Sequence, residues 1–109
     1  MWTIYKKGSF ESAHLLEGHP QCGKLHVHSY NWEVWIQNDV LQDPYGFILD
    51  FHLFKQYFDQ FDHSNIAIKM SAEEIAREAY KYFKKQLPTA NFIRVRIWET
   101  ASCYAEYEQ

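Results

Sequence analysis

The chain has 109 residues and a formal net charge of −3, which is enough length for one domain with its own core. With that charge and no basic block, nothing suggests nucleic acid as a partner. No apolar run approaches roughly 18 residues and no charged segment precedes an apolar one at the start, so we expect no membrane span, no signal peptide and a cytoplasmic location.

Two long strands are predicted first. Residues 2–14 predict a strand in which Gly8 marks a candidate bulge. Residues 15–24 are rich in Gly and Pro and predict a loop. Residues 25–38 alternate regularly and predict a second strand, antiparallel to the first. One face of this second strand would carry His26, His28, Tyr30, Trp32, Val34 and Ile36.

Two helices are predicted next. Asp50 is a candidate N-cap for a helix whose aromatic residues recur at helical spacing. These aromatic residues are Phe51, Phe54, Tyr57, Phe58 and Phe61. Ser71 and Glu74 form the pattern of a capping box, which opens a second helix that Pro88 ends.

Two further strands are predicted at residues 92–98 and 103–107. The order along the chain is therefore two strands, two helices and two strands. This order predicts a single α+β domain over residues 1–109, with both helices packed on one face of an antiparallel sheet.

Three histidines give the strongest chemical signal. His26 and His28 are two residues apart on a predicted strand, so both point to the same face. His14 lies on the neighbouring predicted strand and can complete a set of three. Three neutral nitrogen ligands with an open fourth position are typical of a catalytic zinc site. The alternative interpretation of the closely spaced pair is a surface feature without metal.

Cys22 lies four residues before His26. We interpret it as a nucleophile or an acid/base group beside the metal, and not as a fourth ligand. Its thiol pKa must fall for this role, which a nearby dication or protonated imidazole can cause. An inert thiol in a Gly-containing loop is the alternative.

Several motifs occur in order along the chain. They are Phe10-Glu-Ser-Ala-His14, Cys22-x-x-x-His26-x-His28-Ser-Tyr, Gly46-x-x-x-Asp50-Phe, Asp62-His63, Ser71-Ala-Glu73 and Glu99-Thr100. Together they resemble the 6-pyruvoyltetrahydropterin synthase family over nearly the whole chain. The three-residue gap between Cys22 and His26 is most similar to the bacterial 6-carboxytetrahydropterin synthases of queuosine biosynthesis.

The resemblance implies a tunnelling fold, in which a four-stranded antiparallel sheet carries two helices. It also implies trimers that stack into a homohexamer, with each site between subunits. The implied site residues are His14, His26 and His28 as zinc ligands, Cys22, Asp62 and His63 for proton transfer, Glu99 as the pterin anchor, and Ser71 as a further substrate contact. Capping alone also explains Ser71.

We therefore expect a zinc-dependent carbon–carbon lyase. It would convert 7,8-dihydroneopterin triphosphate to 6-carboxy-5,6,7,8-tetrahydropterin with release of acetaldehyde and triphosphate. The alternatives are a 6-pyruvoyltetrahydropterin synthase, which eliminates only triphosphate, and a non-catalytic module that binds zinc and pterin. Two departures from the family bear on the product: Val27 stands where Gly is usual, and the segment after His63 is short.

Overall fold

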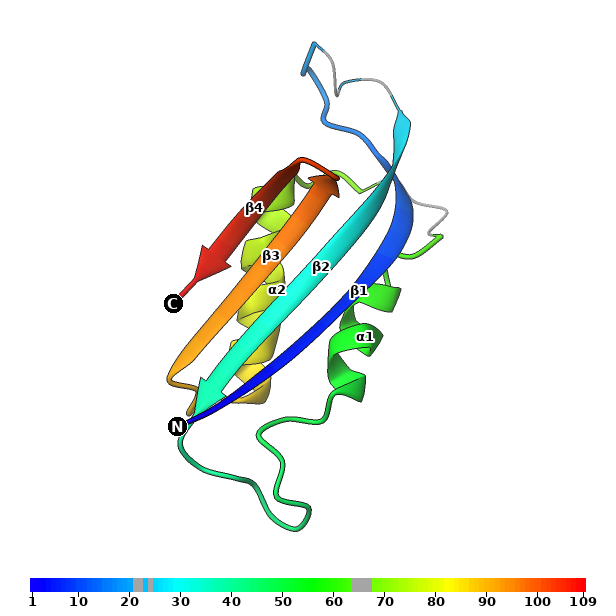
Figure 1. The fold of residues 1–109 in the computed structure, drawn as a ribbon. Coiled ribbons are helices and arrows are strands. Elements are labelled where there is room, and N and C mark those ends of the chain that lie inside the picture. Colours follow the sequence, from blue (N-terminus) through cyan, green and yellow to red (C-terminus); the bar gives the residue numbers. More distant parts are fainter. Residues whose placement is uncertain (21–22, 24, 64–67) are drawn as a thin grey trace.

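The computed structural model describes residues 1–20, 23, 25–63 and 68–109. The sheet has four antiparallel strands in the order β1-β2-β3-β4, and two helices lie on one of its faces (Figure 1). The elements are β1 (Trp2–His14), β2 (His26–Asn38), α1 (His52–Asp59), α2 (Ala72–Gln86), β3 (Phe92–Thr100) and β4 (Cys103–Glu108). The α+β prediction is therefore confirmed. Within the described ranges, no helix combines the length and the apolar character needed to cross a membrane.

The pairing of β1 with β2 is continuous over all thirteen residues of each strand. Gly8 pairs directly with Trp32, so the bulge predicted at Gly8 is wrong. The glycine has a different reason: a Cβ built there would lie 2.3 Å from Cζ2 of the Trp32 indole. Only a residue without a side chain allows the buried indole to cover β1 at this point.

The core lies between the sheet and the helices. Tyr30, Trp32, Val34 and Ile36 alternate along β2 and are fully or almost fully buried. Their partners from the other elements are largely aromatic and aliphatic, among them Phe10, Phe54, Phe58, Ile75, Phe83, Ile93, Val95 and Ile97. The alternation predicted for β2 is therefore the alternation of a half-buried strand.

The helix α2 begins at its predicted cap, whereas the N-cap predicted for α1 at Asp50 is wrong. The Ser71 hydroxyl accepts a hydrogen bond from the Glu74 amide at 3.1 Å, and the Glu74 carboxylate accepts one from the Ser71 amide at 3.3 Å. This confirms the predicted capping box. Asp50 lies just before α1 and accepts a hydrogen bond from the His52 amide at 2.9 Å, although Phe51 holds the N-cap position. Helix α1 ends at Asp59, so Phe61 lies in the turn that follows.

The outer edge of β1 is covered where the chain returns from α1 toward α2. Ile68 forms a parallel bridge with His14, its amide donating to the Ala13 carbonyl at 2.8 Å. The Leu15 amide donates to the Ile68 carbonyl at 2.9 Å. These bonds hold residues 68–70 against the end of β1 that carries His14.

Candidate metal centre

Three imidazoles meet where β1 ends and β2 begins. His14 pairs directly with His26 across the two strands, and His28 follows on the same face of β2. The ring centroids are 5.0 Å apart for His14 and His26, 4.5 Å for His26 and His28, and 5.6 Å for His14 and His28. All three rings therefore share the face of the sheet that the helices cover.

Glu99 joins this cluster from the end of β3. Its Oε1 atom lies 3.2 Å from Nε2 of His28 and 3.8 Å from Nδ1 of His14. One candidate ligand atom from each of His14, His26, His28 and Glu99 lies within 4.8 Å of all the others. The sequence analysis expected Glu99 to hold the pterin, and its position beside the histidines was missed.

A backbone carbonyl orients His14. Its Nε2 atom lies 3.0 Å from the Met70 carbonyl oxygen. Because a carbonyl can only accept, Nε2 carries the proton and Nδ1 keeps its lone pair. That Nδ1 atom faces Nε2 of His26 at 3.1 Å. This is the arrangement by which an outer hydrogen bond sets the tautomer of a metal-binding histidine. A carbonyl has no sequence pattern, so sequence reasoning could not identify it.

The donor set fits a metal ion. Ligands at about 2.0–2.1 Å from a tetrahedral zinc ion lie about 3.3–3.4 Å from each other. The separations of 3.1 and 3.2 Å are close to that value, that of 3.8 Å is longer, and all four atoms lie within 4.8 Å of one another. Among the described residues, the buried Nε2 of His28 has no hydrogen-bond partner, although the Glu99 oxygen is near.

The protonation state of His28 also suits a ligand. Burial lowers the pKa of His28 below its ordinary value, and the positive forms of His26 and His14 would lower it further. The carboxylate of Glu99 opposes these effects. The result favours the neutral imidazole, which is the form that coordinates a metal.

Asp62 and His63 lie outside this cluster, at the edge of β1. The Asp62 carboxylate accepts a hydrogen bond from the Glu11 amide at 3.0 Å, and the His63 amide donates to the Glu11 carbonyl at 2.7 Å. The His63 side chain is 75% exposed, and its backbone has a positive φ of 49°. Within one chain, these two residues therefore pair with the strand edge and do not join the imidazoles.

Cys22 and residues 64–67 of the short segment after His63 lie outside the described residues. Val27, between the two histidines of β2, is 72% exposed on the opposite face of the sheet. The Val at this position is thus directed away from the ligand set.

Ser71 is linked to the histidine cluster through the preceding residue, Met70. Its hydroxyl caps α2, and it directly follows Met70, whose carbonyl accepts from His14. The capping box therefore helps to fix the peptide group that orients this imidazole.

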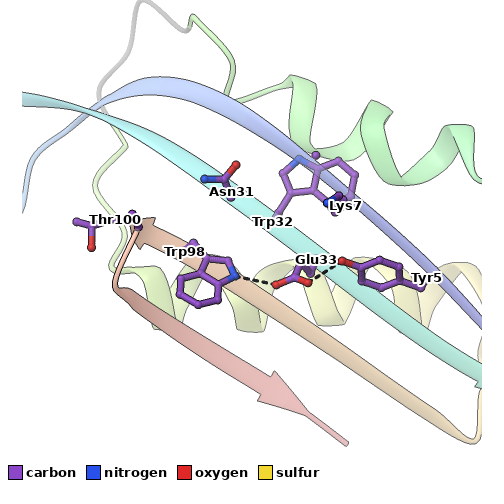
Figure 2. Close-up of a pocket in the computed structure, with 9 residues that line it drawn as sticks. Tyr5, Lys7, Asn31, Trp32, Glu33, Trp98 and Thr100 are labelled. Atoms are coloured by element: carbon purple, nitrogen blue, oxygen red, sulfur yellow. Dashed lines mark hydrogen bonds between the residues drawn. The ribbon is translucent and has the colours of Figure 1, made fainter.

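A separate pocket of about 320 Å³ lies on the sheet face without helices (Figure 2). Figure 2 shows Glu33 between Tyr5 and Trp98, which donate hydrogen bonds to its carboxylate at 2.6 and 2.7 Å. Arg96 adds an ion pair to Glu33 at 3.8 Å. These polar groups satisfy one another's hydrogen bonds. The pocket lies on the sheet face opposite the histidines, so it is separate from the imidazole site.

Comparisons with known proteins identify the family of the chain. Residues 3–109 match the family described as 6-pyruvoyl tetrahydropterin synthase. A protein of Haemophilus influenzae called 6-carboxy-5,6,7,8-tetrahydropterin synthase is 28% identical, with 100% of both chains covered. A protein of Synechocystis sp. with the same name is 34% identical over 72% of this chain and 68% of its own length.

The fold is shared with solved structures. The 6-pyruvoyl tetrahydropterin synthase of Plasmodium falciparum superposes with a TM-score of 0.72 over 99% of this chain and 97% of that chain, at 16% identity. At that identity the likeness concerns the fold alone. It confirms the tunnelling fold expected from the sequence.

Proposed function

The chain belongs to the 6-pyruvoyl tetrahydropterin synthase family, and from this premise we propose that it is a zinc-dependent 6-carboxy-5,6,7,8-tetrahydropterin synthase. It would act on 7,8-dihydroneopterin triphosphate and release acetaldehyde and triphosphate. The names of the two bacterial relatives support this branch of the family. The observation that carries the proposal is the convergence of three imidazoles and one carboxylate on a space that one metal ion would fill.

His14, His26 and His28 would hold the zinc ion. When bound there, zinc would act as a Lewis acid toward the side-chain oxygens of the pterin and lower their pKa. The Met70 carbonyl keeps the His14 ring in one tautomer, so its Nδ1 lone pair is aimed at the site before any ligand arrives.

Cys22, Asp62 and His63 would carry the proton transfers. Asp62 and His63 lie at the edge of β1 and the His63 ring is exposed, so we propose that they serve the pocket of a neighbouring copy. The protein would then act as a homo-oligomer, either a trimer or a dimer of trimers. One chain alone would hold the metal without completing the site.

Glu99 would recognise the pterin ring. A carboxylate accepts two parallel hydrogen bonds from a ring N–H and its neighbouring amino group, which gives planar and specific recognition. Ser71 could add a contact only in competition with its role as N-cap. The whole chain, residues 1–109, would form one catalytic domain that supplies the queuosine pathway in the cytoplasm.

Product analysis tests this proposal. Zinc-loaded protein is incubated with 7,8-dihydroneopterin triphosphate, and the products are identified by mass spectrometry. We expect 6-carboxytetrahydropterin together with acetaldehyde. A 6-pyruvoyl product would overturn the carboxy assignment, and unchanged substrate would overturn catalysis in favour of a binding module.

A pair of matched variants tests the metal in the same assay. His26→Ala should lose zinc and turnover together, because it removes one of the converging ligand atoms. His52→Ala is the control, since its side chain is 93% exposed and pairs only with Asp50 among the described ion pairs. Full zinc content in His26→Ala would contradict the ligand assignment.

A further inference from the structure

We propose that Glu99 is a fourth, displaceable metal ligand in the substrate-free protein, and that the pterin ring competes with the metal for its carboxylate. This inference rests on the proposed function, because it takes zinc as the ion and a pterin as the substrate. It adds a second state of Glu99 to the role of pterin anchor.

The first argument is distance. One carboxylate oxygen of Glu99, Oε1, approaches two histidines. It lies 3.2 Å from Nε2 of His28 and 3.8 Å from Nδ1 of His14. Neighbouring ligands on a tetrahedral zinc ion are about 3.3–3.4 Å apart. Together with the 4.8 Å bound on all four candidate ligand atoms, these distances put Glu99 within reach of an ion held by the three histidines.

The second argument is charge. The other glutamates of the central strands and β4 are paired with arginines on the opposite face: Glu33, Glu106 and Glu108 with Arg94 or Arg96. Among the described residues, the ion pairs of Glu99 involve only His14 and His28. No Lys or Arg of the described chain neutralises this partly buried carboxylate, and a metal cation would supply the missing positive charge.

The third argument is the local backbone of β3. The pairing with β4 runs from Trp98 opposite Tyr104 to Thr100 opposite Cys103 and passes over Glu99 at a register shift. Glu99 is therefore the extra residue of a β-bulge. Bulges redirect side chains and are frequent beside active sites. Because Glu99 has no partner in this ladder, its side chain can change direction without breaking the pairing of its neighbours.

Two partners thus compete for one carboxylate. Without substrate, Glu99 would bind the ion together with the three histidines and would keep other ligands from it. When the pterin enters, its ring N–H and amino group offer Glu99 two hydrogen bonds. Released from the ion, Glu99 would hold the ring while the three histidines kept the metal, so that access of the substrate oxygens to the ion would depend on correct recognition of the ring.

Metal affinity provides the test. Zinc dissociation constants are measured by chelator competition on the full chain for the wild type, Glu99→Gln and Glu106→Gln. We expect Glu99→Gln to bind zinc at least about tenfold more weakly, because a neutral amide oxygen is a poorer ligand. Glu106→Gln is the control: Glu106 is 23% exposed compared with 30% for Glu99, but it pairs with Arg96 on the other face.

The visible absorption of the cobalt(II)-substituted protein gives a second readout. We expect the spectrum of the wild type to change when a pterin without the triphosphate is added, and the spectrum of Glu99→Gln to differ before any pterin is present. If Glu99→Gln does not fold, Glu99→Asp replaces it, since the shortened carboxylate should also withdraw from the ion. Wild-type zinc affinity and an unchanged cobalt spectrum in the folded variant would overturn the proposal.

Failure of this inference can be told apart from failure of the proposed function. Product formation by the wild type, with wild-type zinc affinity in Glu99→Gln, would remove Glu99 from the metal and leave the synthase intact. Weakened zinc binding in Glu99→Gln, without product from the wild type, would establish the ligand and reject the reaction.

Discussion

Substitution of Gly8 by alanine should test the closest packing contact between β1 and the core. The new Cβ would lie 2.3 Å from Cζ2 and 2.6 Å from Cε2 of Trp32. Carbon atoms in ordinary contact are about 3.5–4.0 Å apart, so the indole or the strand must shift by more than about 1 Å. The indole is 1% exposed and stacks on Phe58 with the ring centroids 4.4 Å apart, which leaves it little freedom to withdraw.

The expected loss of stability follows from this contact. Overpacking of a well-packed core typically costs about 1–3 kcal/mol, and a forced shift of this size belongs at the upper end. Replacing Gly by Ala within a strand returns roughly 0.5–1 kcal/mol through reduced backbone entropy. We therefore expect Gly8→Ala to lower the free energy of unfolding by about 2 kcal/mol. With a urea m-value of roughly 2 kcal/mol/M, the midpoint should fall by about 1 M.

Urea denaturation at a fixed protein concentration measures this shift. Trp32→Phe lacks the benzo-ring atom that the Cβ would strike, so Gly8→Ala should cost clearly less in that background. Ser9→Ala, at the next and exposed position of β1, is the control for strand propensity. An unchanged midpoint in Gly8→Ala, or an equal cost in both backgrounds, would refute the assignment of Gly8 to the indole contact.

Three further predictions follow from the contacts around the site and the open face. Ser71→Ala should lower the free energy of unfolding by about 1 kcal/mol and, by loosening the Met70 carbonyl, weaken zinc binding a few-fold. Ser71→Thr should preserve the stability and the zinc affinity. Unchanged zinc affinity in Ser71→Ala would show that the cap does not support the Met70 carbonyl. Burial opposes ionisation of Glu33, yet hydrogen bonds from Tyr5 and Trp98 hold its pKa below the ordinary 4.5. The ionised carboxylate therefore stabilises the fold above pH 4.5, and this stabilisation is lost as the pH falls through the folded-state pKa. Glu33→Gln should be less stable than the wild type near neutral pH and should approach the wild type in acid. A difference in denaturation midpoint that does not change with pH would contradict this. Removing the metal with a chelator should lower the melting temperature. Zinc at about 100 times its dissociation constant should raise the free energy of unfolding by about 2.7 kcal/mol. A melting curve that does not change with zinc would show that the folded protein does not bind it.

Local patterns were sufficient for most of the architecture. Alternation predicted β2 and the face that carries His26 and His28, because successive strand residues point to opposite sides. The capping box predicted the start of α2, since its hydrogen bonds lie within four consecutive residues, Ser71 to Glu74. Element ends were less accurate: α1 ends at Asp59, before the Phe61 that the helical spacing had included.

Only the tertiary structure decided what lies next to the histidines. The Met70 carbonyl and the Glu99 carboxylate reach the imidazoles from segments 56 and 85 residues beyond His14. Gly8 was read from the sequence as a bulge because its contact, the Trp32 indole, is also remote in sequence. Sequence periodicity records which way each side chain points along its own element. Which groups from different elements then meet is set by strand register and by packing against the core, so the nearest neighbours of the imidazoles became visible only in the folded chain.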